Sequence, residues 1–395
     1  MKWWSIIFLM LAILGLGASQ GSAEPVTATI DKLIPLTDPT DDWRVRTTIT
    51  GQRITMYGQI SQAFLGYDDG QVGTTFFPVD NSNASTRVGF LWQLYPILGL
   101  DAVARFEGGI TPRASNSMSQ LDSSGSGFSF DGTHVRKLEL ILDNARFGTL
   151  SLGQGSTATD SVAEIDLSQT KVTAYSSVSQ TAGGQYLRLA DGNLSTLIIG
   201  DVFDNFDGDN VTGYNSDGSR KLRIRYDTPS FNGFKLSAAA GKDTVTNNPA
   251  THLDMALRYE GKFDAFRLSA GAGLSDHGAR KVTSGSLSAL HYGTGGNITV
   301  ALGTENTSGD YIYVKLGLIR EIFAAGDTAF SLDYYNGNDL SVAGSNSRSF
   351  GLAVSQQIKK KNIEVFGLIR RYEFDDPANS YKPSLAIFTG VRWKF

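Results

Sequence analysis

The last residues of the chain alternate between two kinds of side chain, and this pattern restricts the fold more than any other feature. The side chains that suit a lipid surface are Leu385, Ile387, Thr389, Val391, Trp393 and Phe395. The side chains between them are small, charged or mixed: Ala386, Phe388, Gly390, Arg392 and Lys394. Because successive side chains of a strand point to opposite faces, period-two alternation predicts a β-strand with one apolar and one mixed face.

Similar alternating segments follow one another from Gln52 to the C-terminus, separated by clusters of Gly, Asn, Asp and Ser. They predict sixteen strands, although a count of eighteen also fits the pattern. The sixteen predicted strands are 53–65, 85–94, 99–109, 134–143, 148–154, 220–228, 232–241, 251–260, 264–274, 281–292, 296–304, 310–319, 327–335, 347–358, 362–372 and 384–395. In strand after strand, charged residues occupy the face opposite the apolar one. We therefore expect an all-β fold with an apolar outside and a charged inside.

The first residues have the pattern of a secretory signal peptide. Lys2 is followed by an apolar run, 3–16, and then by the small residues Gly21-Ser22-Ala23, so we expect cleavage after Ala23. Residues 24–51 form an N-terminal arm, in which 43–50 alternates faintly and could be an extra strand. Removal of residues 1–23 takes away one lysine and no acid, so the formal net charge of −4 becomes −5.

The predicted strands fit a membrane-spanning barrel. Beyond the signal peptide, no stretch is long and apolar enough to span as a helix. Since lipid cannot satisfy an open sheet edge, strands cross a membrane only as a closed barrel. Sixteen strands would enclose an aqueous channel, where charged side chains lose little hydration.

The connections between strands differ in length in a way that predicts an orientation. Short ones are 144–147, 230–231, 261–263 and 359–361, and long ones are 66–84, 110–133 and 155–219. Short turns on one side and long loops on the other are typical of outer-membrane barrels, with the long loops extracellular. An even number of strands would place both barrel ends in the periplasm.

Composition excludes several other classes of function. The chain has no cysteine, which excludes disulfides, zinc–thiolate sites and thiol nucleophiles. Its four histidines form no zinc-protease motif, and its mildly acidic balance argues against a nucleic-acid partner. We expect neither an enzyme nor a cofactor. Asp276-His277 is only a weak hint of an outer-membrane hydrolase.

Several phrases resemble Gram-negative general porins in order and spacing. They are Tyr57-Gly58, Thr86-Arg87-Val88-Gly89-Phe90, the 147–154 segment Phe-Gly-Thr-Leu-Ser-Leu-Gly-Gln, the 225–234 segment Arg-Tyr-Asp-Thr-Pro-Ser-Phe-Asn-Gly-Phe, and Arg392-Trp393-Lys394-Phe395. Together these phrases span residues 52–395. The chain departs from the family in its N-terminal arm and in the length of 155–219.

The resemblance implies a porin β-barrel over 52–395 that diffuses small hydrophilic solutes and ions passively across the outer membrane of a Gram-negative bacterium. It implies a homotrimer in contact with outer-membrane lipid and lipopolysaccharide, and a third extracellular loop, within 155–219, folded into the pore. The terminal Trp393 and Phe395 would be the signal that the barrel-assembly machinery reads. The alternatives are a solute-specific porin or, further off, an outer-membrane hydrolase or adhesin barrel.

A porin filters solutes at a narrow charged ring, where opposed acids and bases set a transverse field. By resemblance, Arg87 and Arg136 belong to its basic wall, with Arg220 or Arg223 near the position after the loop. Strand parity adds Arg105. Arg136 has the parity of the outward leucines and its neighbour Lys137 the inward parity, a conflict that either a bulge or a trimer-facing position would resolve.

The acidic side of the ring is expected from the infolded loop. Its first acids are Asp160, Glu164 and Asp166, and one helical turn would place Asp160 and Glu164 on one face. The acid-dense stretch with Asp204, Asp207 and Asp209 is a weak calcium candidate, since it lacks a distal bidentate glutamate. A net charge of −5 favours cations, but loop charges count in it too, so the ion preference stays open.

Overall fold

The computed structural model describes residues 45–49, 52–125, 134–207, 220–242, 251–307 and 309–395. The expected signal peptide, the arm up to residue 44 and the calcium candidate Asp209 lie outside the described residues. No helix in the described part of the chain is both long and apolar enough to cross a bilayer.

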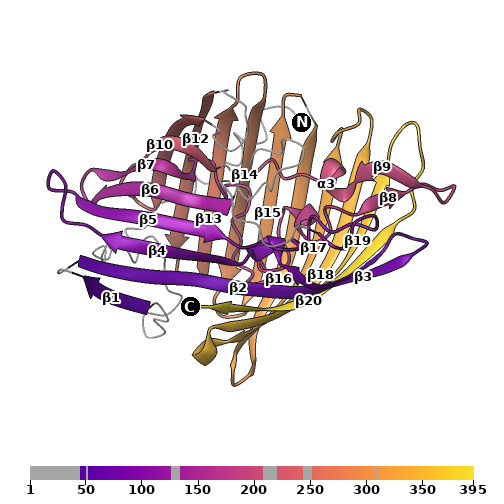
Figure 1. Cartoon of the computed structure of the whole chain (residues 1–395), viewed down its shortest axis with the longest axis horizontal. Helices are drawn as coiled ribbons and strands as arrows, with labels where there is room; N and C mark the ends of the chain where they lie inside the picture. The colour runs from indigo at the N-terminus through magenta and orange to yellow at the C-terminus, as the bar shows by residue number, and fades with distance from the viewer. Residues whose placement is uncertain (1–44, 50–51, 126–133, 208–219, 243–250, 308) are drawn as a thin grey trace.

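Sixteen antiparallel strands form a closed ring (Figure 1), which confirms the all-β barrel. Their bounds, in order around the ring, are β2 (Gln52–Asp68), β4 (Arg87–Gln93), β5 (Asp101–Gly109), β6 (Val135–Asn144), β7 (Gly148–Ser156), β10 (Arg220–Asp227), β11 (Phe234–Lys242), β12 (Thr251–Lys262), β13 (Phe266–Asp276), β14 (Lys281–His291), β15 (Gly296–Glu305), β16 (Asp310–Phe323), β17 (Gly326–Asn338), β18 (Asn346–Ile358), β19 (Ile363–Asp375) and β20 (Ser384–Lys394). The ring closes where β20 pairs with β2, from Gln59 opposite Lys394 to Asp68 opposite Leu385.

Two further strands lie along β2 and lengthen its neighbours. β1 (Val45–Ile49) pairs with the start of β2 on the side of β20, with Val45 opposite Met56. The backbone of Phe395 exchanges two hydrogen bonds with Gly58, of 2.7 and 3.1 Å. β1 therefore continues the row of β20 beyond the C-terminal residue, and the faint alternation over 43–50 does mark a strand.

The second added strand corrects the expected long loop over 66–84. β2 runs on to Asp68, and after a short turn the chain returns as β3 (Gly73–Asp80), which pairs with the far half of β2 beyond β4. Pro78 lies inside this strand, and a proline usually argues against a strand because it has no N–H to donate. The first long-side connection is therefore a tight hairpin.

The remaining connections fall into two sets, one at each end of the ring. One end carries short turns, such as 145–147 between β6 and β7 and the 3₁₀ turn Lys359–Lys361 between β18 and β19. The other end carries the long connections 110–134 and 157–219. We call these the short-turn end and the long-loop end.

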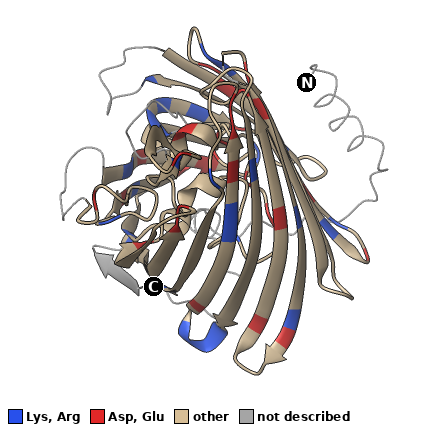
Figure 2. Cartoon of the chain, turned by 90° about the vertical axis from the view of Figure 1, so that its right-hand side faces the viewer, with Lys and Arg blue, Asp and Glu red and all other residues tan. Residues whose placement is uncertain are grey.

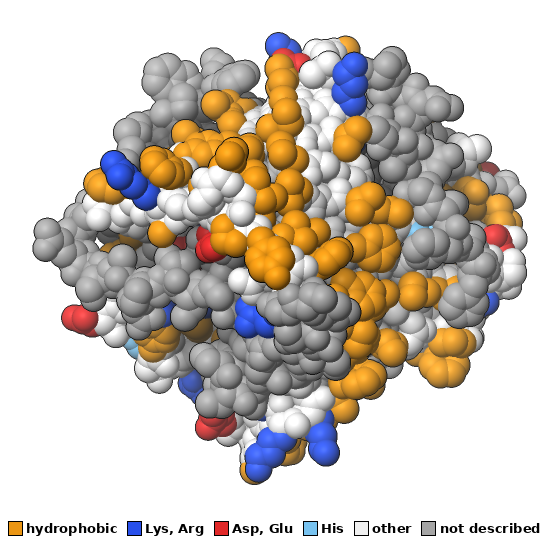
Figure 3. All heavy atoms as spheres, turned by 60° about the vertical axis from the view of Figure 1, so that its left-hand side comes forward, with side chains coloured by type: hydrophobic (Ala, Val, Ile, Leu, Met, Phe, Trp, Pro, Cys, Tyr) orange, Lys and Arg blue, Asp and Glu red, His pale blue; other side chains and the backbone are white. Residues whose placement is uncertain are grey.

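The outward faces of the strands are apolar, as the alternation predicts. Exposed side chains at alternating positions include Leu316, Leu332 and Leu352, with 56%, 56% and 58% of their surface accessible. Figure 3 shows hydrophobic side chains spread over much of the visible face. In β20, Leu385, Ile387, Val391 and Trp393 are exposed while Ala386 and Phe388 are buried. Figure 2 shows charged residues partway along the strands. The strand residues Lys315 and Arg370 are charged and buried.

The core of the molecule lies inside the ring, under the segment 157–206. This segment is not a plain loop, because it contains the hairpin β8 (Tyr186–Arg188) and β9 (Leu194–Ile198) and the short helix α3 (Ile199–Val202). Its apolar residues pack on the inner faces of β16 to β20, β2 and β3. Phe203, for example, lies 5.5 Å from the ring of Tyr335 and 5.3 Å from that of Tyr372. Apolar burial therefore fixes this segment against one side of the interior.

The side chain of Tyr57 lies directly against Gly89. These residues belong to two of the phrases that resemble general porins, Tyr57-Gly58 and 86–90. A Cβ on Gly89 would lie 2.4 Å from Cζ of Tyr57, so only glycine leaves room for this ring on the inner face. The Tyr57 hydroxyl crosses Gly89 and donates to Glu107 on β5 at 2.8 Å. The two phrases therefore form one interior contact across three strands.

Candidate functional site

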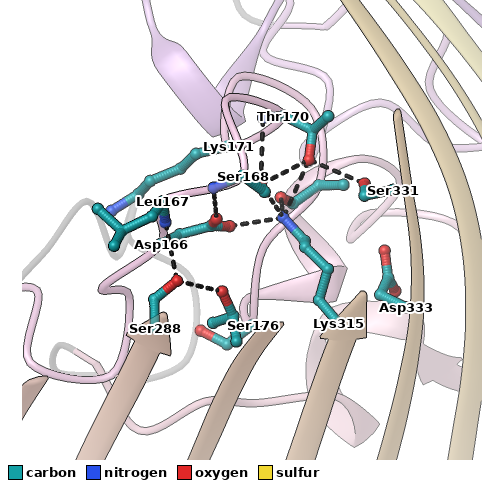
Figure 4. A network of polar contacts seen from close by, with 12 residues as sticks. Asp166, Leu167, Ser168, Thr170, Lys171, Ser176, Ser288, Lys315, Ser331 and Asp333 are labelled. Atoms are coloured by element: carbon teal, nitrogen blue, oxygen red, sulfur yellow. Dashed lines mark hydrogen bonds and ion pairs between the residues drawn. The ribbon is translucent and has the colours of Figure 1, made fainter. Parts of the chain in front are cut away.

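The infolded segment 157–206 is fastened to the barrel wall by hydrogen bonds from strand side chains. Lys315 on β16 donates to the carboxylate of Asp166 at 2.5 Å and to the carbonyl of Ala174 at 2.5 Å (Figure 4). Both side chains of this ion pair are almost completely buried. On β14, Ser288 accepts from the backbone N–H of Leu167 at 3.0 Å. These contacts fix the height at which the segment crosses the interior.

The root of this segment is held by charged side chains of β10 and β12. Arg225 donates to the carbonyl of Thr157 at 2.5 Å, and Arg258 donates to the carbonyl of Asp160 at 2.6 Å. The carboxylate of Asp254 accepts from both the N–H and the hydroxyl of Thr159, at 2.7 and 2.8 Å. The first turn of the segment therefore leaves the wall in a defined direction.

Beside this root lies a cavity of about 350 Å³ on the charged side of the interior. Its lining comes from six neighbouring strands and from the root of the infolded segment: Arg105, Lys137, Ile141, Asp143, Thr149, Ser151, Ser156, Asp160, Arg223, Arg225, Asp227, Lys235 and Arg258. We call this space the lumen cavity. Six of its side chains are cationic and three carry carboxylates, so the lining has an excess of positive charge.

Glu139 on β6 organises two of the predicted basic residues. Its side chain is fully buried and forms ion pairs with both Arg105 and Arg223. Arg223 also donates to the carbonyls of Ser156 and Gly153, at 3.0 and 3.1 Å. The buried carboxylate thus holds both guanidinium groups in place, as charge-assisted hydrogen bonds do.

Asp160 is the predicted acid that the structure brings to the basic wall. Burial raises its pKa, but a hydrogen bond from Ser156 and the charges of Arg220 and Lys137 outweigh burial, so its pKa is lowered from the ordinary value. Asp160 therefore carries a negative charge opposite the cations of β6 and β10. This arrangement can orient a dipolar solute across the cavity.

Glu164 faces a different neighbour. It forms an ion pair of 3.2 Å with Lys171, and its charge acts on Asp207, the residue directly after the segment. Burial and the charges of Glu164 and Asp160 raise the pKa of Asp207 well above the ordinary value. The two acids expected on one face thus lie near a common third acid, although 160–163 forms a turn and not a helix.

Asp166 is placed away from the lumen cavity. Its carboxylate is 2% exposed in the pair with Lys315, whose charge and hydrogen bond overcome the effect of burial and lower the pKa of Asp166. A buried carboxylate of this kind cannot meet a solute. The structure therefore gives Asp166 an anchoring position in place of the expected one in the ring.

A bulge resolves the conflict at Arg136. Glu107 pairs with Lys137 and the next residue, Gly108, pairs with Val135, so Arg136 is the extra residue in β6. The bulge lets Arg136 form an ion pair of 2.7 Å with the inward Glu107. Arg87 lies close enough to interact with the same carboxylate, and neither arginine lines the lumen cavity. The predicted basic residues therefore form two adjoining groups.

Four residues at or behind the lumen cavity were not among the predicted site residues: Glu139, Arg225, Lys235 and Arg258. Arg225 and Arg258 lie on the charged faces of alternating strands, so parity alone could have found them. The resemblance to general porins indicates basic residues of the early strands, whereas Arg258 lies on β12, later in the chain.

The calcium candidate gains no support from the described residues. The carboxylate of Asp204 accepts from the N–H of Phe206 at 2.9 Å, and that of Asp207 accepts from the N–H of Ser161 at 3.1 Å. Within the described ranges, no group of three or more His, Cys, Asp or Glu side chains could hold a metal ion.

Comparison with known proteins supplies the context for this geometry. A family model described as Gram-negative porin matches residues 16–377. No curated protein matches the chain.

Among solved structures, an anion-selective porin from Comamonas acidovorans is similar, with 17% identity and a TM-score of 0.56 over 87% of this chain and 100% of that one. A trimer form of in-vitro folded OmpT from Vibrio cholerae has 13% identity and a TM-score of 0.52, over 87% of this chain and 99% of the other. OmpF of Salmonella typhi, in complex with daunomycin, has 13% identity and a TM-score of 0.53, over 89% and 100%. At these identities the likeness concerns the fold.

Proposed function

This chain belongs to the Gram-negative porin family, and from that premise we propose how its channel is built. As a porin it is a non-enzymatic channel of the bacterial outer membrane. We assign the lumen cavity, with Arg105, Lys137 and Arg223 on one side and Asp160 on the other, as the filter through which small hydrophilic solutes and ions diffuse passively. Arg87 and Arg136 flank the filter on the adjoining wall, with Glu164 further along the infolded segment.

The observation that carries this assignment is the division of the interior into two sides. On one side, the segment 157–206 packs on apolar wall residues and fills the space. On the other, the lumen cavity is lined mostly by charged and polar side chains. Polar solutes cross where charged groups remain hydrated, because an apolar filling excludes them.

The long-loop end is assigned to the cell exterior and the short-turn end to the periplasm. Family barrels have short periplasmic turns and longer extracellular loops. In this orientation the exposed outer face meets lipid, lipopolysaccharide meets the long-loop end, and Trp393 and Phe395 are presented to the assembly machinery from the periplasm. Cleavage after Ala23 would release a mature chain that begins at Glu24, which N-terminal sequencing of the outer-membrane protein would establish.

We also infer that the protein assembles as a homotrimer. The support is membership of the family and the likeness to OmpT of Vibrio cholerae, of which a trimer form is known. The stepwise conductance of the purified protein in a planar lipid bilayer tests both parts of the proposal. We expect steps in groups of three, with a conductance that rises with salt concentration without saturating.

The control for this experiment is the same preparation after heat unfolding, which should give no steps. Absence of channels in a folded preparation would refute the channel assignment. Single, ungrouped steps would refute the trimer alone. A saturating flux of one sugar would favour a solute-specific porin, although Tyr311 and Tyr335, which stack in the interior, are buried and form no accessible aromatic track.

A further inference from the structure

We propose that the lumen cavity is a transit binding site for small oxyanions, and that Lys137, Lys235 and Arg258 form it. The inference rests on the proposed function, because it names the class of solute that the filter prefers. It runs against the formal net charge of the whole chain, −4, which by itself favours cations.

Three of the six cations that line the cavity are already paired with carboxylates. Arg105 and Arg223 share the buried Glu139. Arg225 donates two hydrogen bonds to Asp227, of 2.9 and 2.8 Å. Such pairs hold the wall together, and their charges are largely cancelled before a solute arrives.

The other three cations are differently placed. Lys137, Lys235 and Arg258 line the cavity, and none of them forms an ion pair with a carboxylate of the described residues. Arg258 donates through Nη2 to the carbonyl of Asp160, while its Nη1 is buried and has no hydrogen-bond partner within the described part of the chain. A buried guanidinium nitrogen without a partner is a costly feature unless a ligand uses it.

The carboxylates in and behind the cavity do not balance these cations. The lining holds Asp143, Asp160 and Asp227, three carboxylates against six cations, and Glu139 and Glu107 lie behind it, beside Arg223 and Lys137. Asp143 also accepts a hydrogen bond of 2.5 Å from Thr149. The cavity therefore keeps a positive excess, and it raises the local concentration of anions over that of cations.

The shape and chemistry of the site indicate the kind of anion. A cavity of about 350 Å³ accommodates a small organic acid or inorganic phosphate. The planar fork of an arginine matches the oxygens of a carboxylate or a phosphate, and the two lysines act as point charges beside it. Carboxylate and phosphate share this oxyanion chemistry. Binding has to stay weak enough for release, as in other channels.

The first experiment measures ion selectivity as the reversal potential of single channels under a KCl gradient. We expect the full chain to prefer chloride, and we expect Lys137→Gln, Lys235→Gln and Arg258→Gln each to lower the chloride-to-potassium permeability ratio by about twofold or more. Lys137→Arg should keep the preference. Lys360→Gln, which removes the same charge from the exposed short-turn end, is the matched control and should change nothing.

The second experiment tests binding by adding succinate or inorganic phosphate to channels that carry chloride. Either anion should reduce the chloride current of the unmodified protein, and the reduction should fall in Lys137→Gln and Arg258→Gln. Block by one anion alone identifies the preferred oxyanion. Chloride preference without block by either anion would overturn the binding site.

The outcomes separate this inference from the proposed function. Open channels that prefer potassium would overturn the oxyanion site and leave the porin channel intact. A folded preparation without channels would overturn the proposed function itself. Each glutamine variant is first shown to fold, by a gel band whose mobility changes on heating as that of the unmodified barrel does. A loss of selectivity then cannot come from a loss of fold.

Discussion

Lys315 and Asp166 form an ion pair inside the barrel in which the lysine side chain is 0% exposed and the carboxylate 2%. The pair joins the wall strand β16 to the infolded segment, and Lys315 adds hydrogen bonds to Ser168 and Thr170, both of 3.1 Å. A buried charge with this many partners is stabilised only as long as all of them are present.

Removing Lys315 alone should therefore destabilise the barrel more than removing Lys315 and Asp166 together. We expect Lys315→Met to destabilise the barrel by about 3–5 kcal/mol, because Asp166 is left as an uncompensated buried charge. The double variant Lys315→Met/Asp166→Leu should recover much of this loss. Guanidinium unfolding in detergent, followed by tryptophan fluorescence, measures both, with Lys360→Met as an exposed control. Equal losses in the single and double variants would contradict the anchoring position.

The contact between Gly58 and Phe395 makes a second prediction. A Cβ on Gly58 would lie 2.6 Å from Cζ of the Phe395 ring and 2.6 Å from the carbonyl oxygen of Arg87. Gly58→Val should displace the terminal ring and lower the temperature at which the folded band is lost on heat-modified gels. Gly73→Val is the matched control, because a Cβ there meets no atom within 4 Å. A Gly58→Val barrel as heat-stable as the control would show that the terminal ring is not held there.

Charges of opposite sign near the filter should shift selectivity in opposite directions. Arg87→Ala should lower the chloride-to-potassium permeability ratio and Glu164→Ala should raise it, each by about twofold, because each removes a charge that acts on the filter from beside it. Reversal potentials under a KCl gradient give both ratios. If both variants leave the reversal potential unchanged, the assignment of Arg87 and Glu164 to the surroundings of the filter is refuted.

Asp207, which directly follows the infolded segment, should respond to pH. Because the pKa of Asp207 is raised in the folded protein, protonation of Asp207 stabilises its contact with 161–164. This stabilisation is complete at pH values below the ordinary carboxyl pKa near 3.8, and it is lost as pH rises through the raised pKa. At high pH, Asp207 and Glu164 are both charged and repel. We therefore expect the fluctuation of the single-channel current to increase from acidic to alkaline buffer.

Asp207→Asn removes the titrating group and should abolish this pH dependence. Asp376→Asn is the control, because Asp376 lies in the connection between β19 and β20 and accepts a hydrogen bond from Tyr381 at 2.7 Å. That variant should keep the response of the unmodified protein. A pH response that survives in Asp207→Asn would assign the effect to another group.

The strands were predictable because one physical pattern repeats in each of them. In β16, for example, Ile312, Leu316 and Leu318 are exposed, and Tyr311, Tyr313 and Lys315 are buried. Alternation of this kind is visible in the sequence itself. It also placed Arg105, Lys137 and Arg223 on the inner face, where they line the lumen cavity.

The path of the infolded segment was not predictable, because no short-range pattern sets it. Its position depends on hydrogen bonds between residues far apart in the chain. The backbone N–H of Ile165 donates to the hydroxyl of Ser286 at 2.9 Å, and the side-chain amide of Asn81 donates to the carbonyl of Val172 at 2.8 Å. Parity shows that Lys315 points inward but not that it meets Asp166. The bulge at Arg136 was likewise a conflict in the sequence that only the register between β5 and β6 resolves.

The row beside β2 is assembled from two strands that are far apart in the chain, β20 and β1, with Phe395 followed in space by Val45. The seam of the barrel therefore depends on β20, which pairs with β19 on one side and with β2 on the other. Each hairpin of neighbouring strands can pair locally, but the cylinder closes only when β20 meets β2. A barrel without β20 would leave two open strand edges at this seam, which lipid cannot satisfy.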